Sequence, residues 1–151
     1  MKAVIQRTMT PANVKVDGEI TGSIDKGLIV YLGIGKEDSI EDIQWLAKKV
    51  VQMRIFSDEE GKMNHSVEDI NGGLLVISQF TLFASTKKGN RPSYLESAAP
   101  DLANKLYTDF VNHIKIAYTI PIETGIFAAD MKVDYINDGP VTIIIDSKKK
   151  V

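Results

Sequence analysis

Cysteine is absent from the 151 residues, and histidine is scarce. Without cysteine the chain has no disulfide framework, no thiolate nucleophile and no thiolate metal site. The two histidines are His65, in KMNHS, and His113, beside the apolar stripe of a predicted helix. A lone histidine of this kind is more often a partly exposed surface group than a general base. The sequence therefore gives no support for a Ser–His or Thr–His dyad.

Long apolar runs and the common ligand-binding signatures are also lacking. No run is long enough to span a bilayer, and the opening MKAVIQRTMT lacks the cationic and then apolar layout of a signal peptide. We therefore expect no membrane association and a cytoplasmic protein. The sequence has no Gly-rich phosphate loop, no HExxH motif and no G-x-S-x-G elbow. We expect neither a metal ion nor an organic cofactor.

An excess of positive charge is missing as well. The formal net charge is −2, so the overall field of the protein does not attract nucleic acid. Any such partner has to be held by local basic clusters, and two exist, KKGNR at 87–91 and KKK at 148–150. Each also fits a simpler interpretation, a solvated loop for the first and a frayed tail for the second. For residues 147–151 we expect a mobile tail.

What is present is the pattern of one domain over residues 1–151. No linker or repeat divides the chain, and 44% hydrophobic with 25% charged residues is ordinary for a globular protein. Alternation around Asp17–Gly18 predicts a hairpin, and the glycine-bounded run KGLIVYLGIG predicts a strand buried on both faces. Further strands are predicted at the N-terminus and at residues 72–84, 132–138 and 140–146, and residues 54–64 are predicted to form a strand, an acidic glycine-containing turn and a returning strand.

Two segments change to helical periodicity. Between residues 39 and 54 the apolar residues fall on one stripe, and Ser39 with Asp42 resembles a capping box. A second amphipathic helix is predicted from Pro100, a favoured first-turn residue, through Ile114. Because strands outnumber helices and hairpins are common, the predicted class is α+β with mostly antiparallel sheets.

Polar side chains interrupt the run LLVISQFTLFA, which otherwise predicts a buried strand. In an extended chain Ile77, Gln79 and Thr81 share one face of the strand, and Ser78 shares the other with Phe80. A simple interpretation is that threonine favours strands and that the other polar groups bond to nearby backbone. A buried glutamine nevertheless needs partners for a whole amide, which is an unusual cost without a function.

A second unusual segment is NDGPVT at 137–142. Asn-Asp-Gly-Pro is a strong turn signal, and Pro140 fixes its own φ and removes a hydrogen-bond donor. The segment fits a plain turn at the start of a strand. It also fits a Gly139–Pro140 peptide of fixed, cis geometry that presents two adjacent carbonyls. Spacing alone leaves both interpretations open.

Five segments of the chain together resemble one known family. The segments are VIQR near the N-terminus, SQFTLFA, KKGNRPSY, FAADM and NDGPVTIIID, and the family they resemble is that of the D-aminoacyl-tRNA deacylases. The segments follow that family's order and spacing from Val4 to Asp146, with departures in peripheral loops and in the tail SKKKV. The resemblance implies barrel-like sheets with two helices packed outside. It implies hydrolysis of the ester that joins a D-amino acid to the 3′-terminal adenosine of tRNA, by a homodimer with its active sites at the interface.

The resemblance also assigns residues to the site by motif. The residues expected to line the reacting ester are Ser78, Gln79, Phe80 and Thr81. Those expected to line the pocket for the adenosine and the aminoacyl group are Phe127, Met131 and Ala103. Gly139–Pro140, as a cis peptide, is expected to reach into the partner's site with Arg7 fixing its orientation. Residues placed to meet phosphates of the acceptor end are Lys87, Lys88 and Arg91.

The implied chemistry leaves the role of Thr81 open. Two backbone carbonyls would hold the substrate amino group and reject an L-residue by steric clash, so glycine is expected to be accepted to some degree. An aminoacyl ester is already activated, and the ribose 2′-OH of tRNA could assist water while Thr81 orients groups. The competing hypothesis makes Thr81 a covalent nucleophile, which needs a base that the sequence does not supply. The biological role implied is proofreading of mischarged tRNA.

Three other functions are weighed against this one. A general esterase using Thr81 predicts activity on simple esters without RNA. A ligand-binding oligomer predicts that Gln79 and Thr81 substitutions change stability and no turnover. A tRNA-independent RNA-binding module is disfavoured by the net negative charge and by the lack of an aromatic RNP-like motif.

Overall fold

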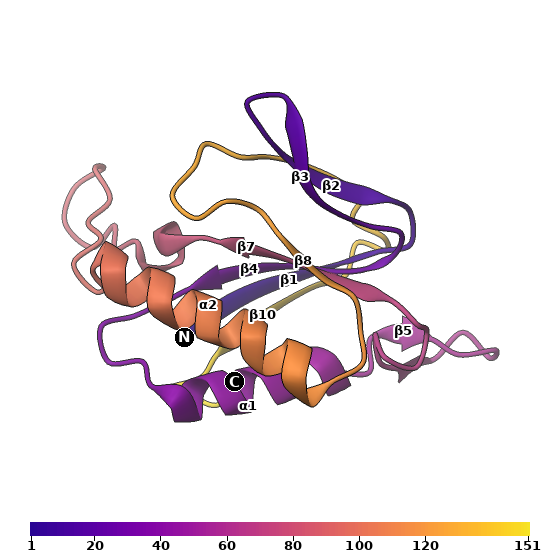
Figure 1. Ribbon diagram of the computed structural model, residues 1–151. Coiled ribbons are helices and arrows are strands. Elements are labelled where there is room, and N and C mark those ends of the chain that lie inside the picture. Colours follow the sequence, from indigo (N-terminus) through magenta and orange to yellow (C-terminus); the bar gives the residue numbers. More distant parts are fainter.

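The computed structural model describes all residues from Met1 to Val151 and shows three layers (Figure 1). Two helices, α1 (Ile40–Gln52) and α2 (Pro100–Ala117), cover one face of a five-stranded sheet, and a three-stranded sheet packs over part of the other face. The predicted α+β class is confirmed, although the sheets do not close into a barrel. Neither helix is both long and apolar enough to cross a membrane.

The five-stranded sheet has the strand order β10-β1-β4-β7-β8. Its strands are β1 (Lys2–Thr8), β4 (Gly27–Gly33), β7 (Gly73–Ser78), β8 (Ile122–Thr124) and β10 (Thr142–Asp146). β1 pairs antiparallel with β10 and β4, whereas β7 pairs parallel with both β4 and β8. Parallel neighbours need crossover connections, which α1 and α2 supply. Antiparallel pairs predominate in the molecule as predicted, but the sequence patterns did not predict the parallel ones.

The three-stranded sheet, of order β3-β2-β9, contains the predicted hairpin. β2 (Ala12–Val16) and β3 (Glu19–Ile24) are joined by Asp17 and Gly18, which both have positive φ as a tight hairpin turn requires. β9 (Lys132–Asp134) pairs with β2. A separate small hairpin is formed by β5 (Phe56–Ser57) and β6 (Met63–His65).

Strands β4 and β7 are buried on both faces because each lies between the other two layers. Leu28 and Val30 point into the larger core, which they share with both helices. Ile29 and Leu75 belong to the smaller core between the two sheets. Strands covered on both faces are continuous apolar runs, which explains why KGLIVYLGIG shows no alternation.

The predicted strand over residues 72–84 is too long. β7 ends at Ser78, and Phe80–Phe83 form a 3₁₀ turn, η1. The prediction that Gln79 and Thr81 share a strand face is therefore wrong. Gln79 still donates its backbone N–H to Leu32 O at 2.8 Å, and after it the chain leaves the sheet.

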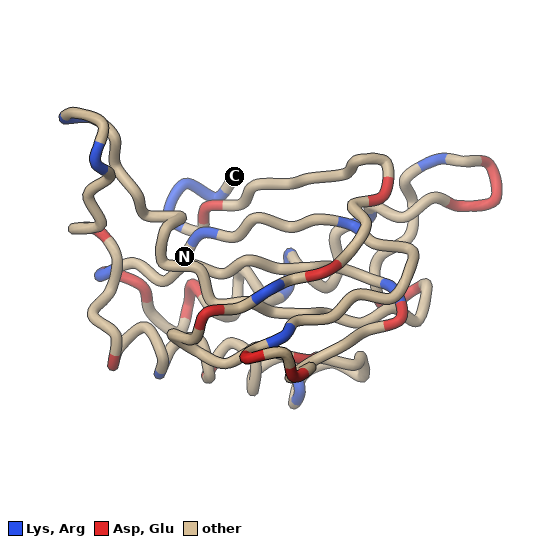
Figure 2. Tube along the Cα trace, turned by 90° about the horizontal axis from the view of Figure 1, so that it is seen from above, with Lys and Arg blue, Asp and Glu red and all other residues tan.

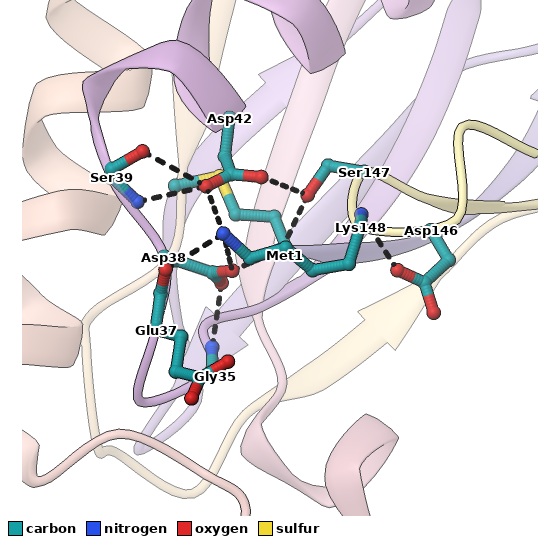
Figure 3. A network of polar contacts seen from close by, with 9 residues as sticks. All are labelled: Met1, Gly35, Glu37, Asp38, Ser39, Asp42, Asp146, Ser147 and Lys148. Atoms are coloured by element: carbon teal, nitrogen blue, oxygen red, sulfur yellow. Dashed lines mark hydrogen bonds and ion pairs between the residues drawn. The ribbon is translucent and has the colours of Figure 1, made fainter.

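The C-terminal segment contacts the start of α1 (Figure 3). The predicted capping box is present, with the Asp42 carboxylate accepting the Ser39 backbone N–H at 2.9 Å. The same carboxylate accepts from Ser147 Oγ at 2.6 Å and from Lys148 Nζ at 2.7 Å. The Met1 ammonium group also donates to Ser147 Oγ, at 2.6 Å. Ser147 and Lys148 are thus held against the fold, and mobility stays a prediction for residues 149–151.

Candidate active site

A cavity of about 540 Å³ opens where β4 and β7 end. Neighbouring parallel strands end at one edge of the sheet, and the segments that leave them frame a crevice there. The wall is mostly hydrophobic and also draws on the start of α2 and on the segment before β9. The residues singled out by the sequence that line it are Ser78, Gln79, Phe80, Ala103, Phe127 and Met131.

The polar edge of the cavity lies at the end of β7. Ser78 is the last residue of the strand, and Gln79 precedes the 3₁₀ turn. The Gln79 side-chain amide donates to Thr81 Oγ1, and both residues are half-buried. Thr81 itself does not line the cavity, and neither do His65 and His113. The hydroxyl partner of Thr81 is therefore an amide, which cannot act as a general base.

The 3₁₀ turn rests directly on the backbone of β4. A Cβ at Gly33 would lie 2.9 Å from Gln79 O, closer than real Cβ atoms approach, and 3.1 Å from Leu82 Cβ, a tight contact. Gly33 is needed for this contact rather than for an unusual backbone conformation. Beside the turn, Lys2 Nζ lies 4.6 Å from the centroid of the Phe83 ring. These contacts fix the position of the polar edge.

The apolar wall is braced from behind by α2. The Tyr107 hydroxyl donates to Val76 O at 2.7 Å, and the Tyr107 ring centroid lies 6.0 Å from that of Phe127. Burial raises the pKa of Tyr107, so its hydroxyl stays protonated and holds this bond. At the mouth, Phe80 is 55% exposed and packs edge-to-face on Tyr94, with centroids 5.0 Å apart. Exposed aromatic rings are suited to stack on a flat ligand such as a nucleobase.

The other residues of the cavity wall were not predicted from the sequence. The further lining residues are Tyr31, Leu32, Ile34, Ile77, Tyr94, Ser97, Ala98, Pro100, Ala128, Ala129 and Val133. Most are apolar, and only long-range packing decides whether an apolar residue faces a cavity or the core. Tyr31 carried a usable signal, because it bears the one hydroxyl in the apolar run KGLIVYLGIG.

Arg7 holds the turn that contains Gly139–Pro140. Its backbone accepts from Asp138 N at 2.8 Å and donates to Val141 O at 3.2 Å, one bond on each side of the turn. Its guanidinium group pairs with Asp138 Oδ2 at 2.8 Å and donates to Ile55 O at 2.7 Å. Arg7 is buried, whereas Gly139–Pro140 is exposed and its peptide bond is cis.

The turn and the cavity lie at opposite ends of the sheet. In the antiparallel register Arg7 is opposite Leu28 of β4, whereas the cavity is lined by Tyr31 and Leu32 of that strand. Three to four residues of strand correspond to about 10–13 Å. The structure thus gathers the motif at 78–80 into the cavity and leaves Gly139–Pro140 outside the cavity of its own chain.

Lys87, Lys88 and Arg91 lie on an exposed loop that projects from the body of the protein (Figure 2). The loop is closed by two backbone hydrogen bonds between Ser85 and Ser93, of 2.8 and 2.9 Å. None of the three basic residues lines the cavity, but the chain that leaves the loop reaches it within a few residues.

Comparison with known proteins agrees with the motifs. The family model described as D-Tyr-tRNA(Tyr) deacylase matches residues 4–146. Over 149 residues the chain is 56% identical to a D-aminoacyl-tRNA deacylase of Thermosipho africanus and 53% identical to one of Fervidobacterium nodosum, covering 99% of both chains in each case.

Two solved structures share the fold. One, the c-Myc DNA Unwinding Element Binding Protein, has 38% identity and a TM-score of 0.91, covering 97% of this chain and 98% of that one. A probable eukaryotic D-amino acid tRNA deacylase has 16% identity and a TM-score of 0.79, covering 95% and 98%. The family expected from the sequence is therefore confirmed, and the chain belongs to the D-Tyr-tRNA(Tyr) deacylase family.

Proposed function

We propose that this protein hydrolyses the ester bond between a D-amino acid and the 3′-terminal adenosine of tRNA, releasing the free amino acid and tRNA. By its family it is a hydrolase of carboxylic esters, as the sequence predicted. The observation that carries the proposal is the cavity, in which a polar edge at Ser78 and Gln79 faces an apolar wall. Its volume lies within the range of small-ligand sites.

The polar edge supplies groups suited to ester hydrolysis. The first N–H groups of a helical turn have no partner inside the turn. In η1 these belong to Phe80 and Thr81, and in this proposal they would stabilise the oxyanion that forms when water attacks the ester carbonyl. The adenine and the aminoacyl side chain would then contact the wall at Phe127, Met131 and Ala103.

A second part of the proposal is that the protein acts as a homodimer. Gly139–Pro140 is exposed and remote from the cavity of its own chain, so its two carbonyls are available to a partner's cavity. The edge strand β10, which follows this turn, exposes 72% of Ile144, and Ile136, in the segment between β9 and β10, is 66% exposed. Apolar side chains at an unpaired sheet edge favour association with a second chain.

The same arrangement accounts for a choice by handedness. Carbonyls of the partner's Gly139–Pro140 would bind the substrate amino group whatever the side chain, and an L-residue would direct its Cβ into this backbone wall. Glycine has no Cβ, so we expect Gly-tRNA to be hydrolysed to some degree. The proposed role is proofreading after mischarging, in the cytoplasm where tRNA is used.

The experiment that tests the function compares D-Tyr-tRNA with L-Tyr-tRNA at equal enzyme concentration, beside a control without enzyme. Loss of the D-ester alone would support both the reaction and the chiral selection. Equal loss of both esters would support an esterase activity but contradict the rejection of L-residues by the Gly139–Pro140 carbonyls. Loss of neither would contradict the deacylase function and favour a ligand-binding protein. Complete resistance of Gly-tRNA at high enzyme concentration would contradict the steric explanation.

A further inference from the structure

A chain of hydrogen-bonded side chains crosses the side of the five-stranded sheet that faces away from the helices. Tyr31 Oη lies 3.0 Å from Tyr135 Oη, and the Tyr135 hydroxyl donates to Gln6 Oε1. Because Tyr135 gives its single hydroxyl proton to Gln6, Tyr31 is the donor to Tyr135. Gln6 Nε2 then donates to Thr142 Oγ1 at 3.1 Å. Side chains from β4, β1, β10 and the segment after β9 are thus joined in series.

The two ends of this chain lie at the two separate parts of the proposed site. Tyr31 lines the cavity. Thr142 begins β10 immediately beyond the Gly139–Pro140 turn and lies directly opposite Gln6 in the β1–β10 register. The chain therefore runs from the cavity wall of a protomer to the turn that the protomer would offer to its partner.

At the turn the chain continues into backbone contacts through Asn137. With its amide nitrogen toward the carbonyls of Val141 and Arg7, at 3.0 and 3.3 Å, both of its donors are satisfied. Its oxygen then accepts from Gln6 Nε2 at 2.9 Å and from Thr142 Oγ1 at 3.0 Å. Through Asn137 the polar chain thus binds the backbone of Val141, which follows the Gly139–Pro140 pair, and the backbone of Arg7 on β1.

Packing between the two sheets does not require the hydroxyl groups of Tyr31 and Tyr135. Burial, helped by the hydrogen bond to Tyr135, raises the pKa of Tyr31, so its hydroxyl stays protonated as a donor. Both rings pack against the small core between the sheets, where phenylalanine would fill the same space without needing partners. A partly buried network of this kind fixes geometry when its members find partners, as the hydroxyl and amide groups named above do.

We propose that the chain from Tyr31 to Thr142 couples the cavity wall to the orientation of the Gly139–Pro140 carbonyls. Tyr135 and Gln6, which lie between the two ends, are then positioning residues for the reaction. The proposal rests on the deacylase function and homodimer proposed above. It predicts that cutting the chain anywhere loosens the turn that checks the handedness of the substrate.

The test uses the full chain with D-Tyr-tRNA and L-Tyr-tRNA. Tyr135→Phe removes the central hydroxyl and keeps the ring. We expect kcat/KM for the D-ester to fall about tenfold, the factor that corresponds to one lost hydrogen bond. The ratio of D- to L-ester hydrolysis should fall as well. Tyr118→Phe is the matched control, because Tyr118 is a partly buried tyrosine at the far end of α2; it should change neither value.

A double-mutant cycle separates coupling from local damage. Tyr31→Phe cuts the chain at the cavity, and Gln6→Glu cuts it at the turn because it removes the donor to both Thr142 and Asn137. Independent substitutions at distant positions multiply in their effects on the rate. If the chain couples them, the double variant should be no slower than the slower single variant. Gln6→Glu keeps the acceptor for Tyr135, whereas Thr142→Val leaves the bond from Gln6 to Asn137 and should lose less activity.

Two results would overturn the proposal. The first is the absence of coupling. It would appear as a wild-type kcat/KM and D-to-L ratio in Tyr135→Phe, or as effects of the two single substitutions that multiply in the double variant. The second is a lower melting temperature with an equal loss of rate on both esters in Tyr135→Phe and Gln6→Glu, because the hydroxyl would then be structural only. If the wild-type protein does not hydrolyse D-Tyr-tRNA, the proposed function itself fails, so the two failures are distinguishable.

Discussion

Arg7 and Asp138 form a 2.8 Å ion pair beside the exposed Gly139–Pro140 turn. The arginine side chain is 10% exposed and the aspartate side chain 43% exposed, so the pair reaches from the core to the surface. The same guanidinium group donates to Ile55 O. Arginine suits this position because its planar fork serves two partners in fixed directions.

Arg7→Lys keeps the charge, but a single ammonium group cannot reproduce both contacts. We expect the free energy of unfolding to fall by about 1.5–3 kcal/mol, the range for hydrogen bonds to charged groups. We also expect the ratio of D- to L-ester hydrolysis to fall, because the turn loses its support. Urea denaturation and the paired ester assay measure the two effects. Asp130→Asn, which removes an exposed ion pair with Lys132, should change neither; an unaltered ratio in Arg7→Lys would contradict the role of Arg7.

Gly33→Ala tests whether the contact between β4 and the 3₁₀ turn sets the position of the polar edge. The new Cβ would meet Gln79 O and Leu82 Cβ, and backbone atoms cannot yield as a flexible side chain can. We expect kcat/KM for the D-ester to fall about a hundredfold, since misplacement by about 1 Å has effects of this size. Gly61→Asn is the control, because Gly61 has open space around it and asparagine tolerates its positive φ. Full activity in Gly33→Ala would show that the turn can shift without harm.

Local patterns were enough to predict the elements of this fold whose signals lie within a few residues. The hairpin follows from alternation around Asp17–Gly18, and α1 follows from its apolar stripe and its Ser39–Asp42 capping box. The strand β8 spans three residues between Pro121 and Gly125, which is too short for any periodicity to show. The end of β7 at Ser78 was missed because Phe80 to Phe83 are as compatible with a strand as with a 3₁₀ turn.

The candidate site was predicted through the resemblance to a known family, which rests on contiguous motifs. Ser78, Gln79 and Phe80 follow one another in the chain and line the cavity together. Tyr31 and Tyr135 are 104 residues apart, and nothing local in either segment indicates that their hydroxyls meet. Such contacts depend on how the two sheets pack, which pattern reasoning on one sequence does not specify.

The Asp42 carboxylate gives the protein a predictable acid sensitivity. Burial alone would raise its pKa, but hydrogen bonds from Lys148, Ser147 and Ser39 hold the pKa well below its usual range. A carboxylate with a lowered folded-state pKa stabilises the fold above its unfolded pKa of about 3.9. This contribution is lost as the pH falls below that value toward the folded-state pKa.

Asp42→Asn should therefore destabilise the protein at neutral pH and matter less in acid. We expect the free energy of unfolding to fall by about 2 kcal/mol at pH 7, with the difference from wild type shrinking steadily below about pH 5. Urea denaturation at a series of pH values measures this directly. Asp109→Asn, which loses a more exposed pair with Lys105, should show a small difference. A difference for Asp42→Asn that does not vary with pH would mean that the ionised state is unimportant.

The basic loop should make tRNA binding sensitive to salt. Each phosphate contact on a single strand contributes about 0.7 to the slope of log affinity against log salt. Replacing Lys87, Lys88 and Arg91 together by glutamine should lower the slope by up to about 2 and weaken binding to all tRNAs alike, since phosphate contacts carry no sequence information. Lys48→Gln with Lys115→Gln, on exposed positions of the two helices, is the control. An unchanged slope in the loop variant would place the acceptor end elsewhere.

Thr81 discriminates between the two mechanisms for ester hydrolysis. Its hydroxyl accepts from the Gln79 amide, and neither histidine lines the cavity, so a base for a covalent nucleophile is lacking. We expect Thr81→Ala to keep most single-turnover activity on D-Tyr-tRNA, whereas tRNA ending in 2′-deoxyadenosine should lose about a hundredfold, the scale of one positioned acid–base group. Thr81→Ser, which keeps a hydroxyl, should behave as wild type. The reverse pattern would be loss of activity in Thr81→Ala and full activity on the 2′-deoxy tRNA, with an aminoacyl group trapped on Thr81. It would establish the covalent route, because that route requires the Thr81 hydroxyl and does not require the ribose 2′-OH.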